Sequence, residues 1–286
     1  MLTRNSFVTV SVAVAALSLL SAAPARAGHD GSPELIRSAI AANSIDAIQA
    51  ELERSEYLVC AACTDLVLPL VDHGDYRVRK VAAWWLSRRA SGKQVFVGML
   101  NRLAQPDSAK AANAADVLGE FGSAAAIPAL SAALSNPIFD GNARAAIARA
   151  LGSIGRADGA AALVTALAAP EPPVKVAALS ALRELGTFNG KGAAPAAALL
   201  ADADANVRAQ AALTLGAART TAGVTELLRA LGSDPSIDVR KRAAWALGEM
   251  GAPAAQAGDG LGRAAKDDAS PVVRSIAAVA IGKLTR

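Results

Sequence analysis

A repeat of about 32 residues runs through most of the chain, and it restricts the possible folds more than any other feature. In most units a basic residue stands seven positions before an apolar residue, and a glycine comes directly after that apolar residue. The apolar residue recurs after 32, 33, 31, 33, 32 and 34 positions. It is found at Leu86, Leu118, Leu151, Leu182, Leu215, Leu247 and Ile281. This agreement indicates seven copies of one structural unit.

Each unit predicts two helices joined by a turn. Residues 238–251 show the second helix most clearly, with an acid and Arg240 at its start, alanines on one side and Gly251 at its end. An earlier apolar stretch, such as residues 223–231, predicts the first helix of the same unit. One helix pair cannot bury its apolar face alone, so neighbouring pairs must stack. The sequence therefore predicts an all-α fold, an α-solenoid of about seven stacked helical hairpins whose second helices line a concave surface.

The composition agrees with closely packed helices and does not favour a nucleic-acid partner. Hydrophobic residues make up 53% of the chain but aromatic residues only 3%, so the core must consist of small aliphatic side chains. The formal charge is +4, and it falls to +2 when the two arginines of residues 1–27 are left out. A charge so nearly balanced does not provide the basic surface that phosphate binding requires. We therefore expect no nucleic acid among the partners.

The first 27 residues have the pattern of an export signal. Arg4 precedes an apolar stretch over residues 7–23, and Ala25-Arg26-Ala27 then gives the pattern that signal peptidase recognises. We expect cleavage between Ala27 and Gly28, and a location in the periplasm or outside the cell. An uncleaved N-terminal anchor is the competing interpretation, since about 17 residues is the lower limit for crossing a bilayer. No later stretch is apolar enough to span a membrane, so we expect no membrane association after cleavage.

Residues 28–56 do not match the repeat and predict an N-terminal helical cap. Ser32 and Pro33 form a typical helix start, and Ser44 begins a second amphipathic helix. Terminal units of a solenoid are commonly atypical, because they cover the core on one side only. The predicted organisation is a signal peptide over residues 1–27, a cap over residues 28–56 and the repeat array over residues 57–286.

The repeat resembles the short HEAT-type repeat, in particular the variety named after phycobilin lyase subunits. The likeness is carried by Asp238-Val239-Arg240 followed by residues 243–248, and the repeat pattern covers residues 57–286. The resemblance implies a binding scaffold in which a turn acid and the following arginine form a ladder between units. The turn acids of the seven units are Asp75, Asp107, Asp140, Glu171, Asp204, Asp238 and Asp268.

Two activities found among similar proteins fit this sequence poorly. Bilin attachment is a cytoplasmic task, whereas this chain is expected to be exported. The HEAT-type deoxyhypusine hydroxylase holds two irons with His-Glu pairs, but His29 and His73 are the only histidines and neither precedes a glutamate. A fold of this kind is in itself weak support for any reaction.

Cys60 and Cys63 are the only cysteines, and several states are open to them. Their spacing suits a disulfide at a helix end, and an exported protein meets oxidising conditions, so a structural disulfide is one state. Closing so short a loop would stabilise the fold by about 2 kcal/mol. The other states are buried thiols on an apolar helix stripe, a redox-active pair, and a metal site that would need two further ligands.

Three tryptophans and two nearby arginines are the candidates for partner binding. Trp84 and Trp245 occupy the same position of the second helix in their units, and Trp85 adjoins Trp84. Tryptophan is common at binding hot spots, so indoles on the concave face would serve as anchors. Packing between units is the alternative for these side chains. Arg88 and Arg89 stand close by, which makes the first unit the best candidate for a docking surface.

No set of residues indicates catalysis. No serine or cysteine has a credible histidine partner, and no cofactor-binding or metal-binding pattern is complete, so we expect neither a cofactor nor a metal. The leading hypothesis is a non-catalytic, exported scaffold that binds a protein or peptide on its concave face. The alternative is an oxidoreductase or a lyase-like enzyme subunit that uses Cys60 and Cys63.

Overall fold

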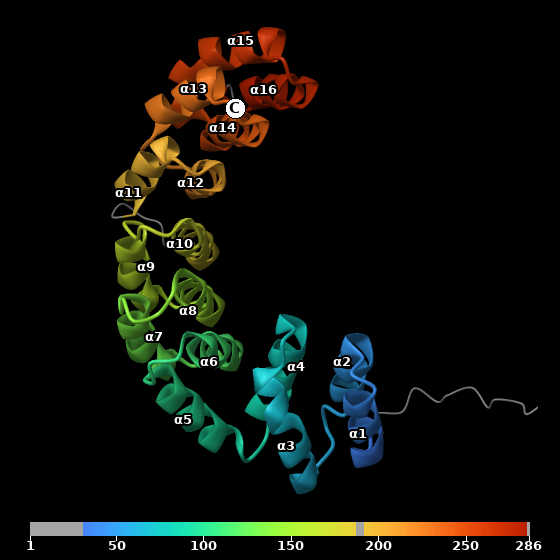
Figure 1. The fold of residues 1–286 in the computed structure, drawn as a ribbon. Coiled ribbons are helices and arrows are strands. Elements are labelled where there is room, and N and C mark those ends of the chain that lie inside the picture. Colours follow the sequence, from blue (N-terminus) through green and yellow to red (C-terminus); the bar gives the residue numbers. More distant parts are fainter. Residues whose placement is uncertain (1–30, 187–191, 285–286) are drawn as a thin grey trace, which may run out of the picture.

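The computed structural model of the chain describes residues 31–186 and 192–284. Within these ranges the chain consists of α-helices joined by turns and short 3-10 segments, with no strand. The helices follow one another along an arc (Figure 1), and the prediction of an all-α solenoid is confirmed. None of the helices described is both long enough and apolar enough to cross a bilayer. The signal peptide predicted at residues 1–27 lies outside the described residues.

Seven pairs of helices form the body of the arc, one for each predicted unit. The pairs are α3 (Ala61–Val67) with α4 (Tyr76–Ser87), α5 (Gly92–Leu103) with α6 (Ser108–Phe121), α7 (Ile127–Leu134) with α8 (Gly141–Ile154), α9 (Ala160–Ala166) with α10 (Pro172–Leu185), α11 (Ala193–Ala198) with α12 (Ala205–Ala218), α13 (Val224–Ser233) with α14 (Ile237–Met250), and α15 (Gly258–Asp267) with α16 (Pro271–Leu284). The 3-10 segments are η1 (Leu68–Asp72), η2 (Ala124–Ala126), η3 (Ala157–Gly159), η4 (Leu199–Ala201) and η5 (Ala252–Ala257).

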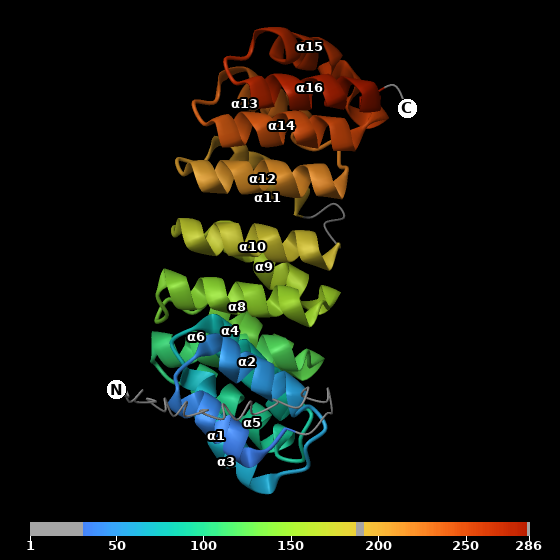
Figure 2. The ribbon, with the colours of Figure 1, turned by 90° about the vertical axis from the view of Figure 1, so that its right-hand side faces the viewer.

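The second helix of each pair lies on the inner side of the arc, and the first helix lies on the outer side (Figure 1). Seen from the inner side, the second helices from α8 to α16 run side by side (Figure 2). The concave surface is therefore lined by second helices, as the sequence predicts.

Two further helices, α1 (Pro33–Ala41) and α2 (Ile45–Arg54), precede the first pair. Ser32 and Ser44 begin them, because each side-chain oxygen accepts a hydrogen bond from the backbone N–H three residues later, at 3.2 and 3.3 Å. The buried side chains of these helices include Ile36 and Ile48, and α2 packs against α4. The two helices thus cover the N-terminal end of the core.

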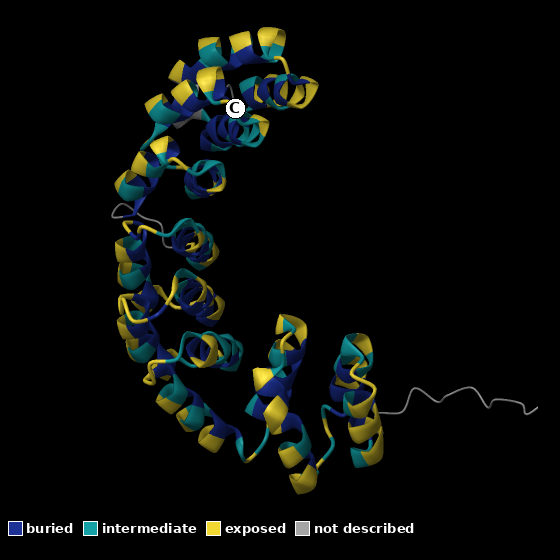
Figure 3. Cartoon of the chain, viewed as in Figure 1, coloured by how far each residue is buried: buried dark blue, intermediate teal, exposed yellow. Residues whose placement is uncertain are grey.

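The core lies between the two layers of helices and consists mainly of alanine, leucine and valine (Figure 3). The glycine after the apolar residue of a unit lets neighbouring second helices approach closely. A Cβ on Gly216 would lie 2.6 Å from the Cα of Ala246, and a Cβ on Gly248 would lie 2.8 Å from the Cα of Ala280. A methyl group does not fit at these distances, so glycine at this position is a packing requirement of the repeat.

Ion pairs link successive units in the C-terminal two-thirds of the array. In the ion pair nearest the C-terminus, Nε and Nη2 of Arg240 lie 2.8 and 3.0 Å from the carboxylate oxygens of Asp268 in the next unit. Nη1 of the same arginine donates to the carbonyl oxygen of Asp234 in its own turn, at 2.9 Å. The four pairs are Arg144–Glu171, Lys175–Asp202, Arg208–Asp234 and Arg240–Asp268. We refer to them as the ladder.

Five of the seven acids predicted for the ladder have other roles, and only Glu171 and Asp268 belong to it. Asp75, Asp107 and Asp140 are the N-caps of α4, α6 and α8. Asp204 is the N-cap of α12, and Asp238 lies in the first turn of α14, where it pairs with basic residues of its own helix. The ladder acids of these units are Asp202 and Asp234, which stand two residues before each N-cap. From this position the carboxylate reaches the preceding unit while another residue caps the helix, whereas Glu171 stands at the N-cap position of α10 and makes no capping hydrogen bond.

The ladder does not extend to the first two units. Arg79 binds Asp116, which lies within α6 rather than in a turn, at 2.7 Å. Lys110, one position out of step with the other basic residues, pairs with Asp107 of its own helix turn at 3.3 Å. The N-terminal part of the array is therefore held together by different contacts from the rest.

Candidate functional site

A hollow of about 670 Å³ lies on the concave side at the N-terminal end of the array, and Trp84 forms part of its wall. Its lining residues are Gln49, Glu53, Glu56, Arg77, Lys80, Val81, Trp84 and Glu120. All of them belong to α2, α4, α6 or the turn after α2, and none belongs to the first helix of a unit. We call this site the Trp84 hollow.

Charged groups of both signs surround the Trp84 indole. The guanidinium of Arg88 lies 4.5 Å above the centre of the indole and 3.4 Å from the carboxylate of Glu56. Lys80 lies 3.9 Å from Glu120, and burial raises the pKa of Glu120, an effect that Lys80 and Arg88 oppose. The hollow therefore offers an aromatic surface inside a ring of mixed charges, which is an arrangement common at protein-binding hot spots.

Trp85 does not contribute to this surface. Its side chain is fully buried, and its Nε1–H donates to the carbonyl oxygen of Ser55 at 3.2 Å. Consecutive residues of a helix point about 100° apart, so Trp84 and Trp85 cannot face the same way. The expectation that both indoles serve as contact anchors is corrected: Trp84 faces the hollow, and Trp85 is a core residue.

Arg89 packs on Trp85 rather than on Trp84. Its guanidinium lies 3.8 Å from the centre of the Trp85 ring, and its Nη2 donates to the carbonyl oxygen of Ser55 at 2.9 Å. It therefore lies apart from Arg88, which covers Trp84 on the concave side. The two tryptophans and two arginines lie close together in the sequence, but the structure places them at two separate sites.

Trp245 lies five units further along the array and packs between second helices. A Cβ on Gly216 of α12 would lie 2.8 Å from the Cζ3 atom of Trp245, so the indole rests on the glycine of the preceding unit. The side chain is partly buried. This is the packing role that the sequence left open, and it does not bring Trp245 together with Trp84.

Cys60 and Cys63 form a disulfide, with their Cα atoms 5.3 Å apart. Cys60 is the N-cap of α3, where its Sγ accepts a hydrogen bond from the backbone N–H of Cys63 at 3.1 Å, and Cys63 is fully buried. Of the states open to the pair, the structure contains the disulfide, located at the start of a short helix. Among the described residues no group of three histidine, cysteine, aspartate or glutamate side chains lies close enough to hold a metal ion.

Two smaller hollows follow on the concave surface, of about 470 and 600 Å³. They lie over α8, α10, α12 and α14 and are floored by small side chains such as Ala145, Val176 and Ala209. Arg149 and Arg242 stand at their walls. The sequence did not single out these hollows, because small residues at these positions also serve the helix packing of the repeat.

Comparison with known proteins agrees with this architecture. A family model described as HEAT repeats matches residues 96–183 and 193–282, which together are more than half of the chain. No curated protein matches. The crystal structure of the Escherichia coli protein YibA is similar with a TM-score of 0.56 and 19% identity, over 88% of this chain and 92% of that one. An engineered protein is similar with a TM-score of 0.54 and 21% identity, over 85% of this chain and 71% of that one. At these identities the two structures support the fold alone.

Proposed function

Because this chain belongs to the HEAT-repeat family, we propose that it is a non-catalytic scaffold that binds a protein or peptide partner on its concave surface, with the Trp84 hollow as the main contact. The observation that carries the proposal is the position of Trp84. It is a partly buried indole in a concave hollow, whereas Trp85 lies in the core. Tryptophan in such a position contributes strongly to binding, because a partner removes a large apolar surface from water.

The surroundings of the indole indicate the chemistry of the partner. A hollow of about 670 Å³ accommodates one or two large side chains rather than a whole domain. Lys80 and Arg77 would meet acidic groups of the partner, and Glu53 would meet a basic group. We therefore propose a segment with an apolar anchor residue flanked by charges of both signs.

Export remains part of the proposal. The support is the sequence pattern of residues 1–27, and a disulfide between the only two cysteines fits an oxidising compartment. The finer likeness to the phycobilin-lyase-type repeat likewise stays a proposal, carried by residues 238–248.

The alternative, an enzyme that uses the Cys60–Cys63 pair, has weaker support. Cys63 is fully buried, and the Cys60 sulfur accepts a backbone hydrogen bond at the start of α3, which are features of a structural disulfide. Replacing both cysteines by serine tests the alternative: a redox role requires loss of activity in a variant that still folds.

The proposed function is tested by partner capture from the exported fraction of the cells that make the protein. Trp84→Ala should lose at least about 2 kcal/mol of binding free energy, which is roughly a thirtyfold loss of affinity. Val97→Ala is the matched control, because Val97 is exposed on α5, on the outer side of the arc. If both variants retain the same partner with the affinity of the unmodified protein, the Trp84 hollow is not the contact site.

A further inference from the structure

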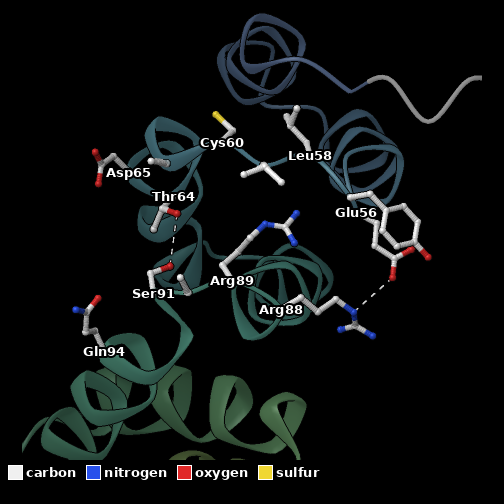
Figure 4. Close-up of a pocket in the computed structure, with 13 residues that line it drawn as sticks. Glu56, Leu58, Cys60, Thr64, Asp65, Arg88, Arg89, Ser91 and Gln94 are labelled. Carbon is white, nitrogen blue, oxygen red and sulfur yellow. Dashed lines mark hydrogen bonds and ion pairs between the residues drawn. The ribbon is translucent and has the colours of Figure 1, made fainter.

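A second hollow, of about 920 Å³, lies between the segment that leaves α2 and the loop that joins α4 to α5 (Figure 4). Residues 56–61 form one wall and residues 88–91 form another. The ion pair between Arg88 and Glu56 lies between this hollow and the Trp84 hollow, since Glu56 lines both. We call the second site the Arg89 hollow.

Arg89 is a half-buried cation at this site, and the nearby acid Glu56 acts on it only through space. Its guanidinium rests on the Trp85 ring, and Nη2 donates to the carbonyl oxygen of Ser55. Its Nε is buried and has no hydrogen-bond acceptor in the part of the chain that the structure describes. Among the described residues no carboxylate forms an ion pair with it, and burial, followed by the neighbouring Arg88, lowers its pKa. A half-buried cation in this state gains more from an anion than an exposed one does, because water solvates it poorly.

The rest of the hollow combines apolar surface with further positive potential. Val59 is 97% exposed, and its neighbour Leu58 lies across the hollow from the Arg89 side chain (Figure 4). The N-terminus of α5 borders the hollow, and the side chain of its N-cap, Ser91, makes no capping hydrogen bond, although the Gly92 N–H donates to the carbonyl oxygen of Arg89 at 2.9 Å. The acid Asp65 also lines the hollow, but its carboxylate points away from Arg89 (Figure 4).

We propose that the Arg89 hollow binds a carboxylate carried on a small apolar body, with the carboxylate on the Arg89 guanidinium and the apolar part against Leu58 and Val59. Arginine matches the two oxygens of a carboxylate, and the exposed valine gives the apolar part a surface that would otherwise face water. Two sources share this chemistry, the C-terminus of a peptide and a free small acid. The proposal does not depend on binding at the Trp84 hollow, because the two sites have separate walls apart from Glu56.

The test is a titration of the isotope-labelled chain with N-acetyl-L-leucine, followed by the NMR signals of the Arg89 Nε–H and the Trp85 Nε1–H. We expect saturable shifts of both signals, with a dissociation constant on the order of 1 mM for so small a probe. The uncharged N-acetyl-L-leucinamide should bind at least about tenfold more weakly, because it lacks the carboxylate. Equal binding of the acid and the amide, or no shift with either, would overturn the proposal.

A variant pair separates the site from general effects on folding. Val59→Asp places a negative charge in the wall of the hollow that Arg89 also lines, on an almost fully exposed side chain, so the chain should fold normally and bind the acid at least about tenfold more weakly. Val279→Asp introduces the same charge on exposed surface of α16, in the last unit of the array, and should leave the affinity unchanged. Acid binding that is equally strong in both variants would contradict the assignment to this hollow.

A peptide arm distinguishes the two sources. A pentapeptide that ends in leucine with a free C-terminus should bind more tightly than N-acetyl-L-leucine if a peptide C-terminus is the natural occupant, and its amidated form should not. Equal affinity of the peptide and the small acid assigns the hollow to free acids. Tighter binding of the amidated peptide than of the free one would refute the carboxylate role of Arg89.

Discussion

Replacing Arg240 by methionine removes one ion pair of the ladder and keeps most of the aliphatic packing. Both side chains of this pair are largely buried, with 14% of the Arg240 side chain and 7% of the Asp268 side chain exposed. In the variant the Asp268 carboxylate would keep the hydrogen bond from the backbone N–H of Ser270, at 2.8 Å. A carboxylate that is poorly solvated and has lost its cation destabilises the folded state.

Arg274 provides a matched control in the last unit. Its Nη1 donates to the carbonyl oxygens of Asp268 and Ala269, at 2.6 and 3.3 Å, as Arg240 does in its own turn. Within the described residues it has no carboxylate partner from a following unit. Arg274→Met therefore removes the same kind of contacts within the turn but no ladder pair, so the difference between the two variants measures mainly the Arg240–Asp268 pair.

The size of that difference follows from burial. Removing one partner of a fully buried ion pair costs about 3–5 kcal/mol, and removing one of an exposed pair costs about 0–1 kcal/mol. The Arg240–Asp268 pair is at the edge of the core, so we expect Arg240→Met to destabilise the last unit by about 2 kcal/mol more than Arg274→Met does. This corresponds to a ratio of about thirty in the equilibrium for opening that unit.

Amide hydrogen exchange measured by mass spectrometry is the appropriate assay, because units of a solenoid open separately and from its ends. Peptides from α16 should exchange about thirtyfold faster in Arg240→Met than in Arg274→Met. Peptides from α8 should exchange alike in both. Equal exchange of α16 in the two variants would refute the claim that the ladder couples neighbouring units.

Three further predictions concern stability. Gly216→Ala should destabilise the folded chain by about 1–3 kcal/mol in urea unfolding, because the added Cβ has no room. Gly98→Ala should stabilise it by about 0.5–1 kcal/mol, because a Cβ there meets nothing within 4 Å. A change of the same sign in both variants would contradict the close-approach argument. Hydrogen bonds from Arg240 hold the pKa of Asp268 below its ordinary value. The ionised Asp268 therefore stabilises the fold above its unfolded-state pKa, and this stabilisation is lost as the pH falls through its folded-state pKa. Burial raises the pKa of Asp116, so this group affects the free energy of unfolding with the opposite pH dependence. In denaturant unfolding, Asp268→Asn should lower the free energy of unfolding more at pH 7 than at about pH 3, and Asp116→Asn should show the reverse trend. Replacing both cysteines of the disulfide by alanine should cost about 2 kcal/mol, and an unchanged unfolding midpoint would exclude a structural role.

The repeat made most of the architecture predictable. The positions of the apolar residue, the glycine and the basic residue are local to one unit, and each recurs in most of the seven units for the same structural reason. The exact ladder acid was less predictable, because Asp202 and Asp204 are both acids near the same turn. Which of them faces the preceding unit depends on how the turn caps α12, and that geometry is not visible in a list of residues.

The burial of Trp85 could have been predicted from the alignment of units. It stands directly before Leu86, and the same position holds Ala150, Ala181 and Ala246 in other units, where the side chain faces a neighbouring helix. A large residue at this position fills space at the cap, where α2 takes the place of a regular unit. The adjacency of the two tryptophans in the sequence concealed this difference.

The Arg89 hollow was not predictable from the sequence. It depends on the path of residues 55–60, which join the cap to the array and follow no repeat. The contact between Arg89 and the carbonyl oxygen of Ser55 spans 34 positions. Irregular segments of this kind are fixed by tertiary packing, so the sites that they form appear only in the structure.

The central claim, that a partner occupies the concave surface at the Trp84 hollow, is tested most directly by photo-cross-linking in the cells that make the protein. A photoreactive amino acid placed at Lys80, in the wall of the hollow, should capture a specific partner, and the same amino acid placed at Val97, on the outer side, should not. Capture of the same partner with equal yield from both positions, or from position 97 only, would contradict the account.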